Sequence, residues 1–436
     1  MGNESVAAGR VSGARAASHR WKVLGVGFAA NASFSAAFSG IPTTAVFLRS
    51  GYHLGNDGLG LVLGMLGLGI AVSELPWGLL TDRWGDRRVL LLGLLSTAAA
   101  LAGLALFVVP SGAHVPGMAT LALGLLLVGL LGGSVNGSSG RAVMAWFREG
   151  ERGLAMSIRQ TAVPAGGGLG ALILPVLASK FGFASAYTVL ALACATTAAF
   201  AWWWLHEPSH AEGNDAGTVH NAATTVPAKV SPLRDIGIWR VALGAGALCV
   251  PQLAVVTFGT VFLHDFSRAG VLTISVTMAA VQTGAAIARV WSGAWTDRRG
   301  NRRAYMRACS VLTAVLFVSL ALVTGLAGAH RAAMTAVFAL MIVLGGISAS
   351  AWHGVAFTEL ATLAGTSRAG TALAIGNTCV FLSLFLTPLA IPPLLSVGSW
   401  PMVWVVASVC ALIALPVFPQ AVHVSKRVVA RACDAT

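Results

Sequence analysis

The chain has 436 residues, of which 56% are aliphatic, aromatic or Cys and only 10% are charged. Soluble domains carry about 25% charged residues, so this composition argues against a soluble enzyme and indicates a polytopic membrane protein. The formal net charge of +13 would suit a nucleic-acid partner, but the placement of the basic residues along the chain argues against that class.

Twelve apolar stretches are long enough to cross a bilayer as helices. They cover about residues 21–48, 57–80, 88–109, 117–141, 153–179, 183–205, 238–264, 268–293, 303–326, 331–358, 366–395 and 399–420. With these spans placed, 22 of the 28 Lys and Arg residues fall on one side of the membrane, 4 on the other and 2 inside spans. Basic residues accumulate in cytoplasmic segments, so we expect both termini in the cytoplasm and no nucleic-acid partner.

The spans divide into two sets of six. We therefore expect a cytoplasmic N-terminal tail (1–20), an N-terminal six-helix bundle (21–205), a cytoplasmic linker (206–237), a C-terminal six-helix bundle (238–420) and a cytoplasmic C-terminal tail (421–436). The first apolar run is too long for a cleaved signal peptide, so we expect it to remain as a spanning helix. The linker lacks apolar periodicity and is rich in Ala, Thr, Asn, Gly and Pro, which is typical of a flexible connection.

One short motif occurs at the end of the second span and again at the end of the eighth. The first copy is Gly78-Leu-Leu-Thr-Asp82-Arg83-Trp-Gly85-Asp-Arg87-Arg88, and the second is Gly293-Ala-Trp-Thr-Asp297-Arg298-Arg-Gly300-Asn-Arg302-Arg303. The Gly before the Asp lets two helices approach closely, and the later Gly allows a turn. The Arg residues then lie in water on the positive side of the membrane, so the motif predicts a hairpin between two spanning helices in each half.

Both copies resemble the signature loop between the second and third helices of the major facilitator superfamily, written G-x-L-x-D-R-x-G-R-R. The ninth position of that pattern is basic but is Asp86 in the first copy and Asn301 in the second, so we expect one of the family's loop contacts to be missing. The resemblance implies an all-α membrane protein with twelve transmembrane helices in two pseudo-symmetric six-helix bundles and a substrate site between them. It also implies that Asp82 and Asp297 close the cytoplasmic end during alternating access.

Two common catalytic motifs are missing from the sequence, which fits a membrane transporter. The phosphate loop G-x-x-x-x-G-K-[ST] and the nucleophile motif G-x-S-x-G are absent. The six Cys are scattered without a C-x-x-C pair, and five of them lie in apolar spans. We therefore expect no enzyme activity, no cofactor and no metal site, and we expect transport to run on an ion gradient or on the substrate's own gradient.

Charged residues inside spans are costly in hydrocarbon and are therefore candidates for function. Arg159 lies about two turns inside the fifth span, next to Gln160, and Arg289 lies one turn before the second motif copy. The resemblance places the fifth and eighth spans face to face, so both Arg residues are candidates for binding an anionic substrate. The alternatives are that Arg159 snorkels to the interface and that each Arg pairs with a carboxylate such as Glu74 or Glu359.

Uncharged polar side chains inside spans complete the candidate substrate ligands. They are Asn31, Asn136, Gln252, Gln282, His353 and Asn377. Amides both donate and accept, so they suit a small polar substrate, although each alone also serves as an interhelical hydrogen bond. The candidates for proton coupling are Glu74, His353 and Glu359, and a neutral His bonded to a nearby carbonyl is the alternative for His353.

Two further stretches bear on the substrate. Val163-Pro164-Ala-Gly166-Gly167-Gly168 partly resembles the G-P-x-x-G-G signature of the superfamily's drug antiporters, but Val163 and Arg159 stand where that signature has Gly. Arg141-Ala-Val-Met-Ala-Trp146-Phe147, followed by Arg152-Gly-Leu-Ala-Met-Ser-Ile, resembles the connection between helices four and five in superfamily porters of small organic acids. Together these resemblances favour an organic anion over a drug.

We therefore predict a secondary active transporter of the inner (plasma) membrane that moves a small solute, with an organic anion such as a carboxylate as first choice and with symport of protons. The expected partners are the small-molecule substrate, the lipid bilayer and protons. One chain contains both halves, so we expect a monomer. Two alternatives stay open: proton-driven efflux of drugs or metabolites, and a transporter-like sensor, which would need an output domain that the linker and short tails do not offer.

Overall fold

The structure is a computed structural model, and it describes residues 2–112, 114–148, 150–206, 231–330, 332–365 and 368–419. Over these residues the chain forms α-helices joined by short connections, and only an isolated bridge between Ser111 and His114 pairs extended backbone. Most of the expected linker and the whole expected C-terminal tail lie outside the described residues. The expected N-terminal tail is the first part of a helix that begins at Gly2.

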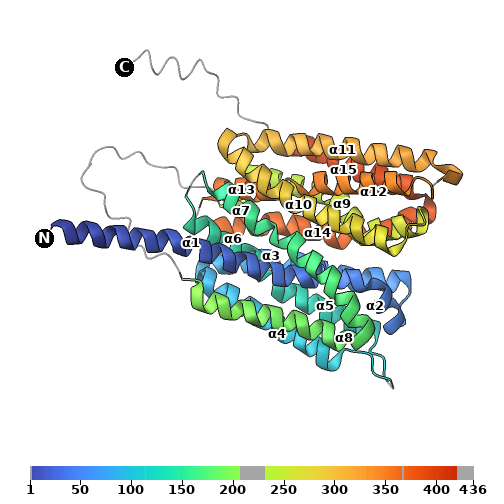
Figure 1. Ribbon diagram of the computed structural model, residues 1–436, viewed down its shortest axis with the longest axis horizontal. Coiled ribbons are helices and arrows are strands. Elements are labelled where there is room, and N and C mark those ends of the chain that lie inside the picture. The colour runs from blue at the N-terminus through green and yellow to red at the C-terminus, as the bar shows by residue number, and fades with distance from the viewer. Residues whose placement is uncertain are drawn as a thin grey trace, which may run out of the picture.

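The first half of the chain contains eight helices. They are α1 (Gly2–Phe38), α2 (Ala45–Gly51), α3 (Asn56–Trp84), α4 (Asp86–Phe107), α5 (Met118–Gly132), α6 (Ser134–Trp146), α7 (Arg152–Gln160) and α8 (Ala162–Trp204). The second half contains seven, which are α9 (Ile236–Val261), α10 (Val271–Arg299), α11 (Arg302–Leu326), α12 (Thr335–Ser350), α13 (His353–Ala364), α14 (Ala369–Val397) and α15 (Trp400–Val417). Figure 1 shows the helices running along one common direction, with most of the first half below and most of the second half above.

These helices accommodate the twelve predicted spans. Ten stretches of the described residues are long and apolar enough to cross a membrane. One of them, Arg152–Trp204, turns back at Gly182, where φ is 76° and a side chain would be strained, so it supplies two crossings. The more polar α10 supplies the twelfth. The all-helical membrane fold predicted from the sequence is confirmed.

Three predicted spans are broken near their middle, which the sequence analysis treated as continuous. The fourth span consists of α5 and α6, the fifth begins as α7 and continues as α8 after Thr161, and the tenth consists of α12 and α13. Pro164 accounts for the break at Thr161, because it has no N–H to donate to the carbonyl of Gln160. Irregular backbone at membrane depth is tolerated where it is buried in protein or lines a cavity.

Buried apolar side chains form several clusters, and several helix pairs join the halves. One cluster gathers residues such as Phe34, Leu66 and Tyr187, and two clusters lie mostly in the second half, one with Trp352 and one with Trp404. Across the halves, α3 and α6 pack against α14, α7 packs against α10 and α13, and α8 packs against α10. Many large apolar side chains remain exposed on the outside of both halves, as expected for a surface in contact with lipid.

Candidate functional site

A small pocket of about 70 Å³ lies between the two halves. Seven of the nine predicted substrate ligands line it, and these are Asn136, Gln160, Gln252, Gln282, Arg289, His353 and Asn377. Apolar side chains such as Phe38 and Phe381 complete the wall. We call this the central pocket. The two remaining candidates, Arg159 and Asn31, do not line it.

Arg289 lines the central pocket and donates hydrogen bonds to two backbone carbonyls that are free because helices break nearby. Its Nη1 donates to the carbonyl of Gln160 at 2.6 Å, and its Nε donates to the carbonyl of Ser350 at 3.1 Å. The Gln160 carbonyl is free because Pro164 cannot bond to it, and Ser350 is the last residue of α12. These two bonds hold a fully buried cation between the halves and leave Nη2 without a hydrogen-bond partner among the described residues.

His353 lies beside Arg289 and uses the same carbonyl. Its Nδ1 lies 3.1 Å from the Ser350 carbonyl, so Nδ1 must be the donor and carry a proton. The ring stacks on Trp352 with centroids 3.9 Å apart. In the neutral ring the other nitrogen, Nε2, is then a hydrogen-bond acceptor.

Arg159 is tied into the first half instead of facing a cavity. Its Nη2 donates to the carbonyl of Asn136 at 2.6 Å and to Ser139 Oγ at 2.7 Å, and its Nε donates to the same hydroxyl at 3.0 Å. The side chain is 2% exposed, so it does not snorkel to the surface. Its direct contact with substrate stays a prediction. Asn31 is also buried, and its amide atoms have no hydrogen-bond partner among the described residues.

Glu74 is buried next to the central pocket and receives hydrogen bonds from both halves. Asn136 donates to its Oε1 at 2.5 Å, and Asn377 donates to its Oε2 at 3.3 Å. The opposite charge of Arg159, which binds the backbone of Asn136, attracts the carboxylate. No ion pair within 4.0 Å involves Glu74 among the described side chains, so neither Arg159 nor Arg289 pairs with it directly.

Glu359, the other carboxylate considered for proton coupling, lies in an ion-pair network near one face of the bundle. Its Oε1 accepts from Arg303 Nε at 2.7 Å, and Arg302 lies 4.0 Å from its Oε2. We call this face, which holds the loops at Gly85 and Gly300 and exposes Arg83, Arg88 and Arg298, the basic face. Glu359 therefore joins the second motif copy to α13.

The first motif copy closes the basic face by binding the start of α14. Asp82 accepts hydrogen bonds from the backbone N–H groups of Gly370 at 3.1 Å and Thr371 at 2.9 Å, and also from the Thr371 hydroxyl. An acidic side chain at a helix N-terminus is stabilised by the free N–H groups and by the helix dipole. Gly78, one turn earlier, lies so close to α14 that a Cβ there would collide with Ala374.

The second copy does the same with α7. Asp297 accepts a hydrogen bond from the N–H of Leu154 at 2.9 Å, and Arg302 donates to its other oxygen at 3.1 Å. A Cβ at Gly293 would collide with Ser157. Each copy of the motif thus docks on a helix of the opposite half, and the two contacts are related by the repeat.

The acidic residue at the ninth position of the first copy has a partner of its own. Asp86 binds Arg141 Nη1 at 2.8 Å, and Arg141 Nε also lies 3.4 Å from Asp82. Whether a contact of the family is missing stays a prediction. Arg87 donates to the carbonyl of Trp202 at 2.8 Å and stacks over its ring.

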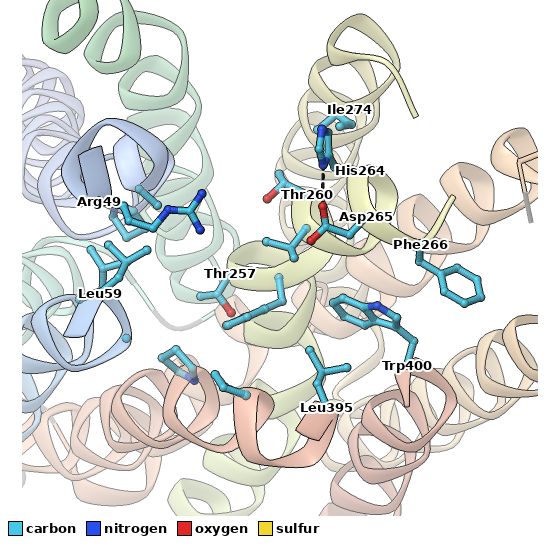
Figure 2. A pocket seen from close by; sticks show the side chains of 18 of the residues that line it. Arg49, Leu59, Thr257, Thr260, His264, Asp265, Phe266, Ile274, Leu395 and Trp400 are labelled. Atoms are coloured by element: carbon cyan, nitrogen blue, oxygen red, sulfur yellow. Dashed lines mark hydrogen bonds and ion pairs between the residues drawn. The ribbon is translucent and has the colours of Figure 1, made fainter. Parts of the chain in front are cut away.

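A second cavity of about 990 Å³ opens on the face opposite the basic face. Figure 2 shows its wall, with Arg49 on one side and Thr257, Thr260 and Trp400 on others. His264 and Asp265 lie at its rim, with 2.6 Å between His264 Nδ1 and Asp265 Oδ1 and with more than half of each side chain exposed. We call this the outer cavity.

The outer cavity and the central pocket are neighbours. Both are lined by Phe38, Pro42, Thr257 and Leu384, so they adjoin. The sequence analysis did not predict the outer cavity, although the similar stretches Val46-Phe-Leu-Arg49 and Val261-Phe-Leu-His264 pair Arg49 with His264 as equivalent positions of the two repeats. That pairing is a usable signal, because equivalent ends of the first and seventh spans meet at the same face of the bundle.

One stretch of the sequence matches a metal-binding pattern, although the sequence analysis expects no metal site. His206-Glu207-Pro208-Ser209-His210 fits H-E-x-x-H, although Pro208 disfavours the helix on which that pattern places its two His. Residues 207–210 lie outside the described part. In the part that is described, no group of three His, Cys, Asp or Glu side chains is placed to hold a metal ion.

Comparison with known proteins agrees with the fold described above. Residues 26–388 match the family model described as Major Facilitator Superfamily. The uncharacterized MFS-type transporter Rv2994 of Mycobacterium tuberculosis is 28% identical over 401 residues, which cover 92% of this chain and 85% of the relative.

Two solved structures share the fold. The proton:xylose symporter XylE, bound to 6-bromo-6-deoxy-D-glucose, superposes with a TM-score of 0.75 at 14% identity, over 92% of this chain and 95% of that one. The human organic anion transporter MFSD10 superposes with a TM-score of 0.69 at 16% identity, over 92% of this chain and 99% of that one. At these identities the likeness shows the fold alone.

Proposed function

Because this chain belongs to the major facilitator superfamily, a family of membrane transporters rather than enzymes, we propose that it carries a small organic anion, such as a carboxylate, together with a proton. Transport is by alternating access to the central pocket. We further propose that the protein is a monomer in the plasma membrane and that the basic face is the cytoplasmic one, as the distribution of basic residues predicts.

The observation that carries the proposal is the charge of the central pocket. Arg289 lines it, and no Asp or Glu does so among the described residues. Two of the donor groups of Arg289 are held by backbone carbonyls, which carry no full charge, so its positive charge is not neutralised there. A buried cation without a bound counterion is costly, and an anionic substrate would supply that counterion.

The amides of the central pocket suit the rest of a small polar solute. Five of them, from Asn136, Gln160, Gln252, Gln282 and Asn377, converge on one pocket. Its volume of about 70 Å³ corresponds to about two water molecules in this conformation. A drug-sized ligand needs about 300 Å³ or more, so the central pocket favours a small substrate over a large lipophilic one.

Alternating access follows from the two contacts at the basic face. The outer cavity is open, while Asp82 and Asp297 hold the basic face closed by binding α14 and α7 of the opposite halves. If the halves rock, these contacts break and the outer cavity closes over Phe38 and Trp400. The substrate then faces the other side of the membrane without a continuous pore.

Thermal unfolding of the detergent-purified protein tests the substrate class. We expect one group of small carboxylates to raise the unfolding temperature, because a ligand that binds the folded state stabilises it. The effect should be lost in Arg289→Ala and partly kept in Arg289→Lys. Stabilisation by lipophilic drugs only, or equal stabilisation by carboxylates of Arg289→Ala, would contradict the proposal, and the first result would favour efflux.

A further inference from the structure

Glu74 controls the orientation of two amides in the wall of the central pocket. Its side chain has no exposed surface and does not itself line the pocket. Its two oxygens accept hydrogen bonds from the Nδ2 atoms of Asn136 and Asn377, which both do. Asn136 belongs to the first half and Asn377 to the second, so one carboxylate fixes an amide on each side of the interface.

The protonation state of this carboxylate decides what those amides offer to a ligand. An ionised carboxylate only accepts hydrogen bonds, so both Asn side chains must turn their NH₂ groups towards it. Each NH₂ group keeps one further N–H, while both amide oxygens stay unbound by Glu74, and an oxygen in the pocket wall repels an anion. A protonated carboxyl group can also donate, and an Asn that turns by half a rotation to accept this bond presents its NH₂ group to the pocket instead.

We propose that Glu74 binds the coupled proton on Oε2 and that its protonation reverses the hydrogen-bonding polarity of Asn377, the more distant of its two amide partners, while Asn136 keeps donating to Oε1. This rests on the proposed function, because the reversal matters only for an anionic ligand. The proton comes from solution that reaches the pocket and adds to one carboxylate oxygen, and no other covalent bond changes. The anion gains twice, since a negative charge is removed and the amide of Asn377 turns its NH₂ group to the pocket. The proton and the anion therefore bind and leave together.

The other carboxylates near Glu74 are engaged with charged or donor groups, so Glu74 is the carboxylate that can respond to a change of pH. On α3 itself, Asp82 lies two turns away and is bound to Thr371. The described side chains of α5 carry no charge, and the titratable group of α14 is Cys379.

The helices α4, α6 and α7 carry charged groups. On α6, Arg141 is engaged with Asp82 and Asp86. The charged residues of α4 are Asp86, Arg87 and Arg88, in its first turn near Gly85. Arg159 on α7 is the charge that acts on Glu74, and it stays bound to Ser139 and the Asn136 backbone.

The hydrogen bond to Asn377 also crosses the interface that must open during transport. Glu74, Gly78 and Asp82 are spaced by four residues on α3, so they form one stripe that faces α14. Protonation of Glu74 thus changes the contact between α3 and α14 at its inner end, and Asp82 closes the same contact at the basic face. The protonation state of Glu74 is in this way coupled to the movement of the halves.

Binding of succinate, lactate and benzoate to the purified full-length protein at a series of pH values tests the proposal. For wild type, linkage to one proton predicts that the dissociation constant rises by about tenfold per pH unit on the alkaline side. Glu74→Gln is neutral and can both donate and accept, so it should bind the same anion with little pH dependence. In liposomes it should exchange anions while a pH gradient no longer drives accumulation.

Matched variants distinguish the effect of the amides on anion binding from the effect of the carboxylate charge. Asn377→Leu should weaken binding and flatten its pH dependence, whereas Gln252→Leu, which changes an amide of the same pocket that does not contact Glu74, should weaken binding and keep the wild-type slope. Glu151→Gln removes an exposed carboxylate that pairs with Arg20 and should leave both affinity and slope unchanged. An unchanged slope in Glu74→Gln overturns the proposal, and an unchanged slope in Asn377→Leu overturns the part assigned to the amides.

Infrared spectra of the ligand-free protein distinguish failure of this inference from failure of the anion hypothesis. On acidification, wild type should gain a protonated-carboxyl band together with a shift of side-chain amide bands, and both should be missing in Glu74→Gln. These changes support the proton site even if none of the three probe anions binds. Their absence over the whole pH range in which the fold stays intact overturns it.

Discussion

Glu74 and Arg289 occupy equivalent positions in the two repeats, and each makes a hydrogen bond across the interface between the halves. Glu74 accepts from Asn377 at 3.3 Å, and Arg289 donates to the carbonyl of Gln160 at 2.6 Å. Asn377 and Gln160 are also equivalent, because Gln160-Thr161 and Asn377-Thr378 are 217 residues apart and the two motif copies are 215 apart. One pair of equivalent positions thus has an acidic residue in the first half and a basic residue in the second, and of these two only Arg289 lines the central pocket.

Neutralising the motif carboxylates should slow transport. Asp82→Asn keeps an acceptor but loses the charge that binds the start of α14, and hydrogen bonds to charged groups contribute about 2 kcal/mol. We expect transport to fall by about tenfold or more in Asp82→Asn and in Asp297→Asn, with normal abundance in the membrane. Thr371→Val, which removes one donor to Asp82, should have a smaller effect in the same direction. Wild-type flux in both Asn variants would show that these contacts do not control closure.

Adding a methyl group at Gly78 should hold the basic face open. The new Cβ would meet Ala374 and the carbonyl of Gly370 on α14, so the close packing of α3 on α14 cannot form. Spin labels on Cys introduced at positions 88 and 299, in a background without the native Cys, should report a longer distance across the basic face in Gly78→Ala. The matched control is Gly103→Ala, where the methyl group enters open space; an equal distance in both variants would contradict the packing argument.

Removing Arg159 should mainly reduce stability. Its guanidinium satisfies the Asn136 carbonyl and Ser139 inside the first half, and each buried polar group left without a partner costs about 1 to 3 kcal/mol. We expect Arg159→Ala to unfold at a clearly lower temperature, and Arg159→Lys to recover part of the loss because it keeps the charge. If Arg159→Ala were as stable as wild type and had lost anion binding, Arg159 would be a direct ligand of the substrate.

The sequence predicted the site best for polar residues inside apolar spans, because the cost of burying a polar group leaves such a residue few possible environments. An amide or Arg in the middle of an apolar span must bind a partner or face a cavity, and seven of the nine residues chosen on that ground line the central pocket. The repeat of the motif also predicted two equivalent hairpins, and both dock at the basic face as a related pair.

The rest depends on how each helix is rotated and where it breaks. Arg159 and Gln160 are neighbours in the sequence but point in different directions, and only Gln160 lines the central pocket. The partners of Glu74 come from α6 and α14, which are distant in sequence, so packing alone brings them together. Arg141 as the partner of Asp86 was unpredictable for the same reason.

Counterflow in proteoliposomes tests the central claim most directly, because it asks whether one protein exchanges a small organic anion across a membrane without a driving gradient. Liposomes loaded with unlabelled succinate, lactate or benzoate and containing wild-type protein should take up the labelled form of at least one of these anions. Arg289→Ala should not, and Glu74→Gln should still do so. Exchange of none of the three by wild type, or undiminished exchange by Arg289→Ala, would contradict the account.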